Sequence, residues 1–162
     1  LIYVETTVIG NVAGRIHSNP DVASRQRTTR TWWNTAALQY ELAISQLVID
    51  ECGDGDRAAA QERLDVLAGL TVLAITDDAR AFARELNAKG AVPPSEPRDA
   101  LHIAVAAVQR VQYLVTWNFQ HIASATLRGR INRVCRDFGH KPPTICTPEE
   151  IAGMTDDTVD TD

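Results

Sequence analysis

Apolar positions along this chain cluster into short runs, separated by longer stretches in which apolar residues recur at helical spacing. Four runs have the length and composition of buried strands and are followed at once by polar residues: 2–4, 42–45, 71–75 and 113–116. A fifth run, at 142–146, begins with two prolines, which is typical of an edge strand. The segments between the runs are too long for hairpins. The pattern therefore predicts a three-layer α/β/α fold with a parallel sheet of four or five strands.

Capping residues mark where the predicted helices begin, because a side-chain oxygen at that position accepts a hydrogen bond from a free backbone N–H. The expected caps are Asp21, Asp56, Thr76 and Thr147, and Glu150 completes a capping box with Thr147. The predicted helices cover residues 6–13, 22–40, 46–52, 57–68, 77–89, 98–110, 123–138 and a segment from 148. The helix at 98–110 is apolar on nearly every side, which predicts a place at the centre of the core.

Composition is typical of one globular domain. A chain of 162 residues can bury a sizeable core without disulfides. Neither a membrane span nor a signal peptide is expected, since the sequence has no run of about 18 apolar residues and no basic-then-apolar leader. Three irregularly spaced cysteines favour a reducing cytoplasm over a disulfide framework or a zinc site. The domain is expected to cover 1–152, with an acidic, disordered tail at 153–162.

Two basic stretches interrupt a chain whose net charge is −5. Residues 15–30 hold four arginines against Asp21, a net charge of +3, and residues 124–141 hold five basic residues against Asp137, a net charge of +4. Such stretches can steer phosphate groups, although solvated helix faces explain them equally well. The candidates for phosphate contacts near the first strand are Arg15, Arg25, Arg27 and Arg30.

Polar residues gather where the predicted strands end. Glu5 follows the first strand, Glu51 lies in the helix after the second, and Asp99 begins the core helix. Asn118 lies two residues beyond the fourth strand. The carboxyl ends of parallel strands share one edge of the sheet, so these side chains are expected to converge there. Converging carboxylates repel one another unless a cation neutralises them, which indicates Mg²⁺ or Mn²⁺. Acids at helix starts also serve as dipole partners, and the sequence is equally compatible with that role.

Several side chains near this edge have two possible roles. Asp50 adjoins Glu51, and helix phase alone does not separate the two as ligands. His102 lies three residues after Asp99, and His121 three after Asn118. Either imidazole could approach an ion, and a structural hydrogen bond is the alternative for both. Trp32 and Trp33 could stack on a base, but adjacent tryptophans on a helix point about 100° apart, so at least one is expected in the core or a dimer interface.

Four segments resemble the signature blocks of PIN-domain proteins of the VapC-like toxin kind. The blocks are IYVETTVI at 2–9, ISQLVIDE at 44–51, DALHIA at 99–104 and LVTWNF at 114–119. No single block is specific, but all four occur in order at compatible spacing, over about residues 1–152. The resemblance implies a metal-dependent endoribonuclease, commonly a homodimer and often neutralised by a cognate antitoxin peptide in its active-site groove. The four arginines near the first strand then become candidates for contacts with RNA.

The resemblance also assigns roles to individual residues. It places the family's acids at Glu5, Glu51 in preference to Asp50, and Asp99, and its fourth metal-site position at Asn118. Hydroxyl positions that hold carboxylates or metal-bound water correspond to Thr7 and Thr116.

This chain departs from the family pattern at three positions. The family's first acid is usually aspartate, and Glu5 is one methylene longer. Its fourth position is often an acid, where Asn118 is neutral, and His121 stands where many relatives carry another aspartate. These departures imply a single Mg²⁺ or Mn²⁺ ion bound with reduced affinity, and an activity that is slow or restricted to a preferred RNA.

Two alternative functions stay open at this point. A PIN-like protein with weakened catalysis could bind RNA or a peptide, and the neutral Asn118 supports that alternative. A phosphate-accepting signalling domain or a phosphatase also gathers acids on a parallel sheet. Those proteins need an aspartate nucleophile at a strand end, whereas the first strand here ends at Glu5.

Overall fold

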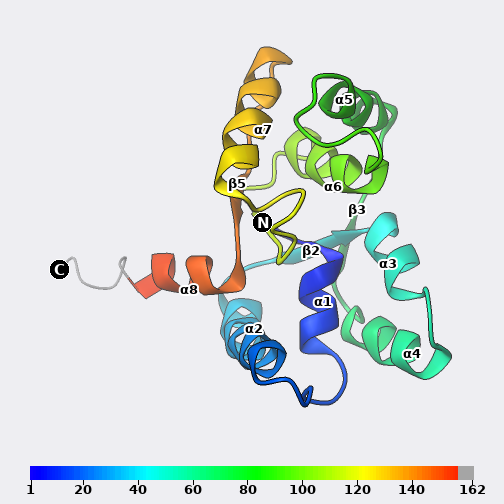
Figure 1. Ribbon diagram of the computed structural model, residues 1–162, viewed down its shortest axis with the longest axis vertical. Coiled ribbons are helices and arrows are strands. Elements are labelled where there is room, and N and C mark those ends of the chain that lie inside the picture. The colour runs from blue at the N-terminus through cyan, green and yellow to red at the C-terminus, as the bar shows by residue number, and fades with distance from the viewer. Residues whose placement is uncertain (157–162) are drawn as a thin grey trace.

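Five parallel strands form one sheet in a computed structural model that describes residues 1–156 (Figure 1). In chain order the strands are β1 (Ile2–Val4), β2 (Leu42–Ser45), β3 (Thr71–Leu73), β4 (Tyr113–Val115) and β5 (Thr144–Cys146). Their order in the sheet is β3-β2-β1-β4-β5, and all four neighbouring pairs are parallel. The predicted α/β fold class is confirmed. From β1 the chain adds β2 and β3 on one side of the sheet, and then adds β4 and β5 on the other side. The direction in which strands are added therefore reverses between β1 and β4, and parallel sheets bind ligands at such a reversal.

The helices cover both faces of this sheet. They are α1 (Thr6–Val12), α2 (Pro20–Gln39), α3 (Gln46–Cys52), α4 (Arg57–Val66), α5 (Asp77–Ala88), α6 (Pro97–Val108), α7 (Ala125–Asp137) and α8 (Pro148–Asp156). Figure 1 shows α5, α6 and α7 on one side of the strands and α1, α2 and α4 on the other. Strands covered in this way are apolar on both faces, and all three residues of β1 are fully buried.

Strand register sets which residues leave the sheet together. Val4 at the end of β1 lies opposite Val115 at the end of β4. Glu5 and Thr116 follow these two residues, so both emerge at the same edge of the sheet, at the same height. Two residues 111 positions apart in sequence thereby become neighbours.

The core helix α6 occupies the place that its apolar sequence predicts. Ala100 and the run 103–106 are fully buried, and Ala107 is nearly so. α6 packs against α5, and the turn after it passes through Arg110, which has a positive φ of 56°. His102 is the polar exception, because its side chain is also completely buried. Such a ring needs hydrogen-bond partners inside the protein.

One expected cap is wrong by two residues. α2 begins at Pro20, and Asn19 is its N-cap, accepting hydrogen bonds from the N–H groups of Asp21 (2.9 Å) and Val22 (3.3 Å). Proline suits the first helical position because its missing N–H would have no partner there. Asp56, Thr76 and Thr147 cap their helices as predicted, and the N–H groups and side chains of Thr147 and Glu150 bond reciprocally at 3.1 Å.

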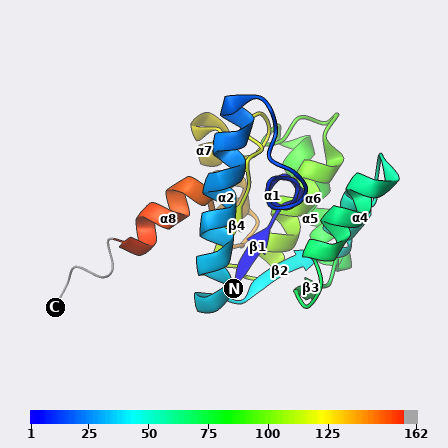
Figure 2. The ribbon, with the colours of Figure 1, turned by 90° about the horizontal axis from the view of Figure 1, so that it is seen from below.

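The C-terminal helix α8 packs beside α2 and projects away from the rest of the domain (Figure 2). It continues to Asp156, so it runs across the boundary expected at residue 152, and the rest of the expected acidic tail, 157–162, lies outside the described residues. Arg128 of α7 holds Glu150 with two 2.9 Å hydrogen bonds. Among residues 1–156, none of the helices combines the length and apolar character that crossing a membrane requires.

Replacement of Ile103 tests the central role of α6. Ile103→Ala leaves a cavity between α6 and the sheet, and we expect the free energy of unfolding to fall by about 2–5 kcal/mol. Urea denaturation followed by circular dichroism measures the change. Val72→Ala is the control, because that side chain on β3 is 54% exposed and its truncation leaves no cavity. Equal losses in the two variants would contradict the assignment of the core.

Candidate functional site

Glu5 is fixed at the point where β1 turns into α1. It is the N-cap of α1 and only 3% exposed. Its Oε2 accepts hydrogen bonds from the Thr7 N–H (3.1 Å), the Thr7 hydroxyl and the Thr116 hydroxyl (2.8 Å). Thr7 and Thr116 therefore lie where the family resemblance assigns hydroxyls that hold a carboxylate. These bonds replace the water that the buried carboxylate loses.

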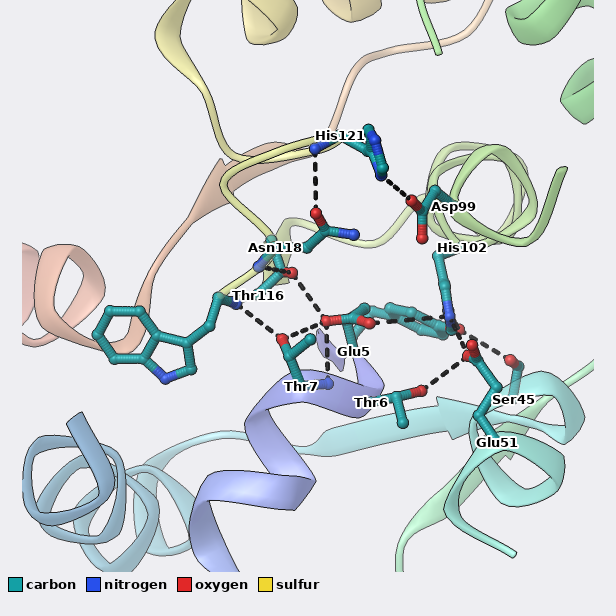
Figure 3. A network of polar contacts seen from close by, with 12 residues as sticks. Glu5, Thr6, Thr7, Ser45, Glu51, Asp99, His102, Thr116, Asn118 and His121 are labelled. Carbon is teal, nitrogen blue, oxygen red and sulfur yellow. Dashed lines mark hydrogen bonds and ion pairs between the residues drawn. The ribbon is translucent and has the colours of Figure 1, made fainter. Parts of the chain in front are cut away.

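The second carboxylate comes from α3. Glu51 Oε1 accepts a hydrogen bond from the Thr6 hydroxyl at 2.9 Å and lies 2.5 Å from His102 Nε2. The same ring nitrogen lies 3.9 Å from Glu5 Oε1, so one imidazole joins the two acids. Asp50 is exposed and accepts instead from the Gln46 amide at 2.9 Å. The fold thus turns Glu51 toward Glu5 (Figure 3), while Asp50 is exposed to solvent.

The His102 ring uses both of its nitrogens inside the protein. Nδ1 lies 2.8 Å from the Tyr3 hydroxyl, which in turn lies 2.8 Å from Ser45 Oγ. With Nε2 against Glu51, the contacts form one buried relay: Ser45, Tyr3, His102 and Glu51. Neither nitrogen is left for an ion. The structure favours the hydrogen-bonding role for His102 over the role of a metal ligand.

Electrostatics around this relay favour an ion pair. Burial alone would lower the pKa of His102, but the hydrogen bond with Glu51 and the charges of Glu5, Glu51 and Asp99 raise it above its ordinary value. Burial would raise the pKa of Glu51, but its hydrogen bonds and ion pair with His102 bring it below the ordinary value, assisted by Thr6. Burial, with the nearby acids, raises the pKa of Tyr3, which keeps it protonated. Three acids therefore act on one ring.

The third acid lies at the start of α6, close to the loop after β4. Asp99 Oδ2 is 2.9 Å from His121 Nδ1, and Asn118 Oδ1 accepts the His121 N–H at 3.0 Å. The Asn118 N–H donates to Thr116 Oγ1 at 2.9 Å, so the loop is tied to the hydroxyl that also holds Glu5. His121 positions Asp99 as His102 positions Glu51. Figure 3 shows Asp99, Asn118 and His121 facing Glu5 and Glu51 across one space.

Sequence reasoning missed Glu96. The Glu96 carboxylate forms a cluster with the Asp99 carboxylate and the His121 imidazole, and the ligand atoms of this cluster lie within 4.8 Å of one another. The spacing held a signal, because Glu96 precedes Asp99 by three residues and α6 begins between them. Asp99 is the member that this cluster shares with the acids expected from the sequence.

The donor set fits a hard divalent cation. In the described structure each of three carboxylates has one oxygen engaged in hydrogen bonds and one that accepts none: Glu5 Oε1, Glu51 Oε2 and Asp99 Oδ1. Asn118 Oδ1 accepts one bond and retains a second lone pair. Oxygen ligands of this kind suit Mg²⁺ or Mn²⁺. The polar partners set the orientation of the carboxylates without any ion.

The four arginines near β1 do not share one role. Arg30 donates to the carbonyls of Asn11 (3.4 Å), Ala13 (3.3 Å) and Gly14 (2.6 Å), and so closes the loop between α1 and α2. Arg15 is exposed. Arg27 lines a hollow of about 460 Å³ between α2 and α8, whose lining contains none of the site carboxylates.

Arg25 lies against aromatic rings beside the site. Its guanidinium carbon is 5.0 Å from the ring centroid of Trp117 and 5.7 Å from that of Phe119. Trp32 is 5% exposed and belongs to the core, while Trp33 is half-buried against it. The aromatic rings against Arg25 are thus Trp117 and Phe119, and not the tryptophan pair that the sequence suggested for base stacking.

Comparison with known proteins identifies the family. A family model of the PIN domain matches residues 2–121, and the chain belongs to the PIN-domain family. The fold is similar to that of a chain in the crystal structure of VapBC2 from Rickettsia felis bound to a DNA fragment from their promoter. The TM-score is 0.57 at 18% identity, over 91% of this chain and 98% of that chain. A search of curated proteins gives no match. The resemblance drawn from the four sequence blocks is confirmed.

The His102–Glu51 pair makes the stability of the metal-free protein depend on pH. The raised pKa of His102 contributes its full stabilisation at pH values below 6.5, the ordinary pKa of histidine. This contribution is lost as the pH rises through the pKa of His102 in the folded protein. The lowered pKa of Glu51 contributes its full stabilisation at pH values above 4.5, the ordinary pKa of glutamate. This contribution is lost as the pH falls through the pKa of Glu51 in the folded protein. We therefore expect the free energy of unfolding of wild type to exceed that of Glu51→Gln by about 1–3 kcal/mol between pH 4.5 and pH 6.5, where the difference is largest.

Urea unfolding in a chelating buffer across the pH range measures this difference. The gap should narrow as the pH rises above that window and as it falls below it. Asp50→Asn is the matched control, because its carboxylate is exposed and accepts a hydrogen bond from the Gln46 amide, outside the imidazole relay. A gap between wild type and Glu51→Gln that stays constant with pH would contradict the ion pair.

Proposed function

We propose that this protein is a metal-dependent endoribonuclease that hydrolyses phosphodiester bonds of RNA. The observation that carries the proposal is the convergence of Glu5, Glu51 and Asp99 around His102, each with one oxygen free of hydrogen bonds. They lie at the carboxyl edge of the sheet, beside the point where its winding changes direction. Membership of a family of nucleases supports the same reaction and favours it over a phosphate-accepting domain or a phosphatase.

The side chains divide the work between holding and orienting. We propose Glu5, Glu51 and Asp99, with Asn118 as a weaker member, as the ligands of Mg²⁺ or Mn²⁺. Of these, Asp99 also belongs to the cluster with Glu96 and His121. Thr7 and Thr116 hold the first carboxylate in place, while the two histidines orient the others. A bound divalent ion supplies a water of lowered pKa and stabilises charge on the phosphate. No covalent intermediate is required, so the carboxylates serve as ligands only.

The charge of the site supports weak ion binding and slow or selective cleavage. Asn118 is neutral, and His121 adds an imidazole beside Asp99. The raised pKa of His102 favours its protonated form, whose positive charge would lie between Glu5 and Glu51 and offset part of their negative charge. The second candidate is accordingly a PIN-domain protein of weakened catalysis that binds RNA or a peptide.

The biological setting follows from the same family. We propose the toxin of a toxin–antitoxin pair, forming a homodimer in the cytoplasm and bound by a cognate antitoxin. The similar structure is that of VapBC2 with promoter DNA, and the three cysteines of this chain are free and buried. Light scattering of the purified protein tests the dimer. Growth arrest on expression, relieved by one co-expressed partner, tests the pairing.

Removal of one carboxylate tests the nuclease. Asp99→Asn should reduce Mn²⁺-dependent cleavage of RNA about 100-fold or more, since even partners of metal ligands contribute 10- to 100-fold. Gel analysis of labelled RNA with and without Mn²⁺ measures the rate. Asp50→Asn, an exposed neighbour of Glu51, should cleave as wild type does. Unchanged cleavage in Asp99→Asn, or cleavage without any divalent ion, would sink the proposal.

Restoring a charge at Asn118 tests the fourth ligand position. Asn118→Asp adds a carboxylate while an oxygen remains to accept the His121 N–H, so Mn²⁺ should bind about 10-fold more tightly. Isothermal titration measures the affinity. Asn34→Asp adds the same charge on an exposed part of α2 and should leave the affinity unchanged. Equal affinities in wild type and Asn118→Asp would remove Asn118 from the ligand set.

A further inference from the structure

Two aromatic rings and an arginine form a cluster immediately beside the candidate site. Trp117 and Phe119 flank Asn118 in the chain, and their ring centroids lie 6.0 Å apart. The guanidinium of Arg25 lies over both rings. We name these three residues the aromatic–arginine cluster.

The cluster is tied directly to the carboxylate site. The Trp117 N–H donates to Thr7 Oγ1 at 2.9 Å, and the Thr7 hydroxyl donates to Glu5. Through these bonds one threonine holds both the first acid and the backbone of the cluster. The cluster therefore keeps a constant position relative to the bond that would be cleaved.

Trp117 provides a rigid base, and Phe119 provides exposed surface. Trp117 is 8% exposed, and its Nε1–H donates to the Thr29 hydroxyl at 2.8 Å. That hydroxyl donates to the Arg25 carbonyl at 2.6 Å, so indole and arginine backbone are held together. Phe119 is 46% exposed. A single exposed ring is ordinary on a protein surface, but here it adjoins both a cation and an acidic site.

The charge of Arg25 is not neutralised within the fold. Among the side chains that the structure describes, those of residues 1–154, no carboxylate pairs with Arg25, in contrast to Arg128 and Arg98. Stacking on aromatic rings uses the face of the guanidinium and leaves its N–H edges available. A ring face for a base and a cation for a phosphate, side by side, together match one nucleotide.

We propose that the aromatic–arginine cluster binds an unpaired nucleotide of single-stranded RNA next to the scissile bond. Phe119 stacks on the base, and Arg25 contacts a neighbouring phosphate. A base inside a duplex is already stacked and paired, so the cluster selects single strands and loops. This inference rests on the proposed ribonuclease function for its substrate, but binding at the cluster requires no metal ion.

Fluorescence anisotropy in a chelating buffer tests the proposal without cleavage. The probes are a labelled single-stranded RNA of about 12 nucleotides, the same RNA annealed to its complement, and an abasic phosphate oligomer of equal length. Phe119→Ala should weaken binding of the single strand about 10-fold and leave the abasic oligomer and the duplex nearly unchanged. Phe119→Tyr should restore the affinity, because it keeps the ring.

The arginine has its own readout. Arg25→Gln should lower the affinity for all three probes, because each of them carries phosphates. It should also make the slope of log K against log salt for single-strand binding about 0.7 less steep. Matched controls are Arg133→Gln on α7 and Phe138→Ala at the C-cap of α7. Phe138 is 42% exposed, and the length of α7, about 20 Å, separates it from the loop that contains Phe119.

Three results would overturn the proposal. They are wild-type affinity of Phe119→Ala for the single strand, an equal loss on the abasic oligomer, and no binding of single-stranded RNA by the wild-type chain. The nuclease is judged separately by Mn²⁺-dependent cleavage. If the wild-type chain cleaves RNA but Phe119→Ala does not change binding, only the proposed role of the aromatic–arginine cluster is rejected. Base-dependent binding at Phe119 without cleavage supports the cluster and removes the nuclease.

Discussion

Burying an ionisable ring in a protein core lowers stability unless hydrogen bonds and an opposite charge compensate for the lost hydration. His102 meets that constraint with Tyr3 on β1 and Glu51 on α3 as its direct partners, and Ser45 at the end of β2 bonds in turn to the Tyr3 hydroxyl. The ring can be buried only if these elements are correctly assembled around α6. The same contacts orient Glu51 and favour the protonated form of His102 between Glu51 and Glu5, so the stability of the domain and the geometry of the acidic edge depend on one relay.

Asp99, on the other side of the site, is also held by a histidine. His121 bonds to Asp99, and Asn118 fixes the backbone of His121, so each acid outside Glu5 has an imidazole partner. The carboxylates are thus preorganised by protein groups, with one oxygen of each left for an ion. This arrangement lowers the repulsion among the acids in the absence of metal and also lowers the net attraction for a cation. Thr7 extends the organisation outward, because it joins Glu5 to the backbone of Trp117 and hence to the surface that we propose for RNA.

Much of the fold could be predicted because its signals are local. Apolar runs with polar ends located all five strands, and side-chain caps at Asp56, Thr76 and Thr147 located helix starts. The cap of α2 was misplaced because Asn19 and Asp21 are both good caps, and only the backbone conformation at Pro20 distinguishes them. Three of the acids were recognised from their positions: Glu5 after a strand, Glu51 in the helix that follows a strand, and Asp99 at the start of the core helix. Glu96 was not, because it lies in the proline-rich loop before α6, where its three-residue spacing to Asp99 was the available signal and was not used.

The sequence by itself determined the order of strands and helices, the parallel α/β class and the family, since these depend on patterns within short segments and on their order. Only the tertiary structure decided between Asp50 and Glu51, showed that both nitrogens of His102 are engaged, and brought Arg25 against Trp117 and Phe119. The physical reason is distance along the chain. Contacts between residues 50 or more positions apart follow from strand register and helix packing, and a one-residue change in either would turn a different side chain toward the site.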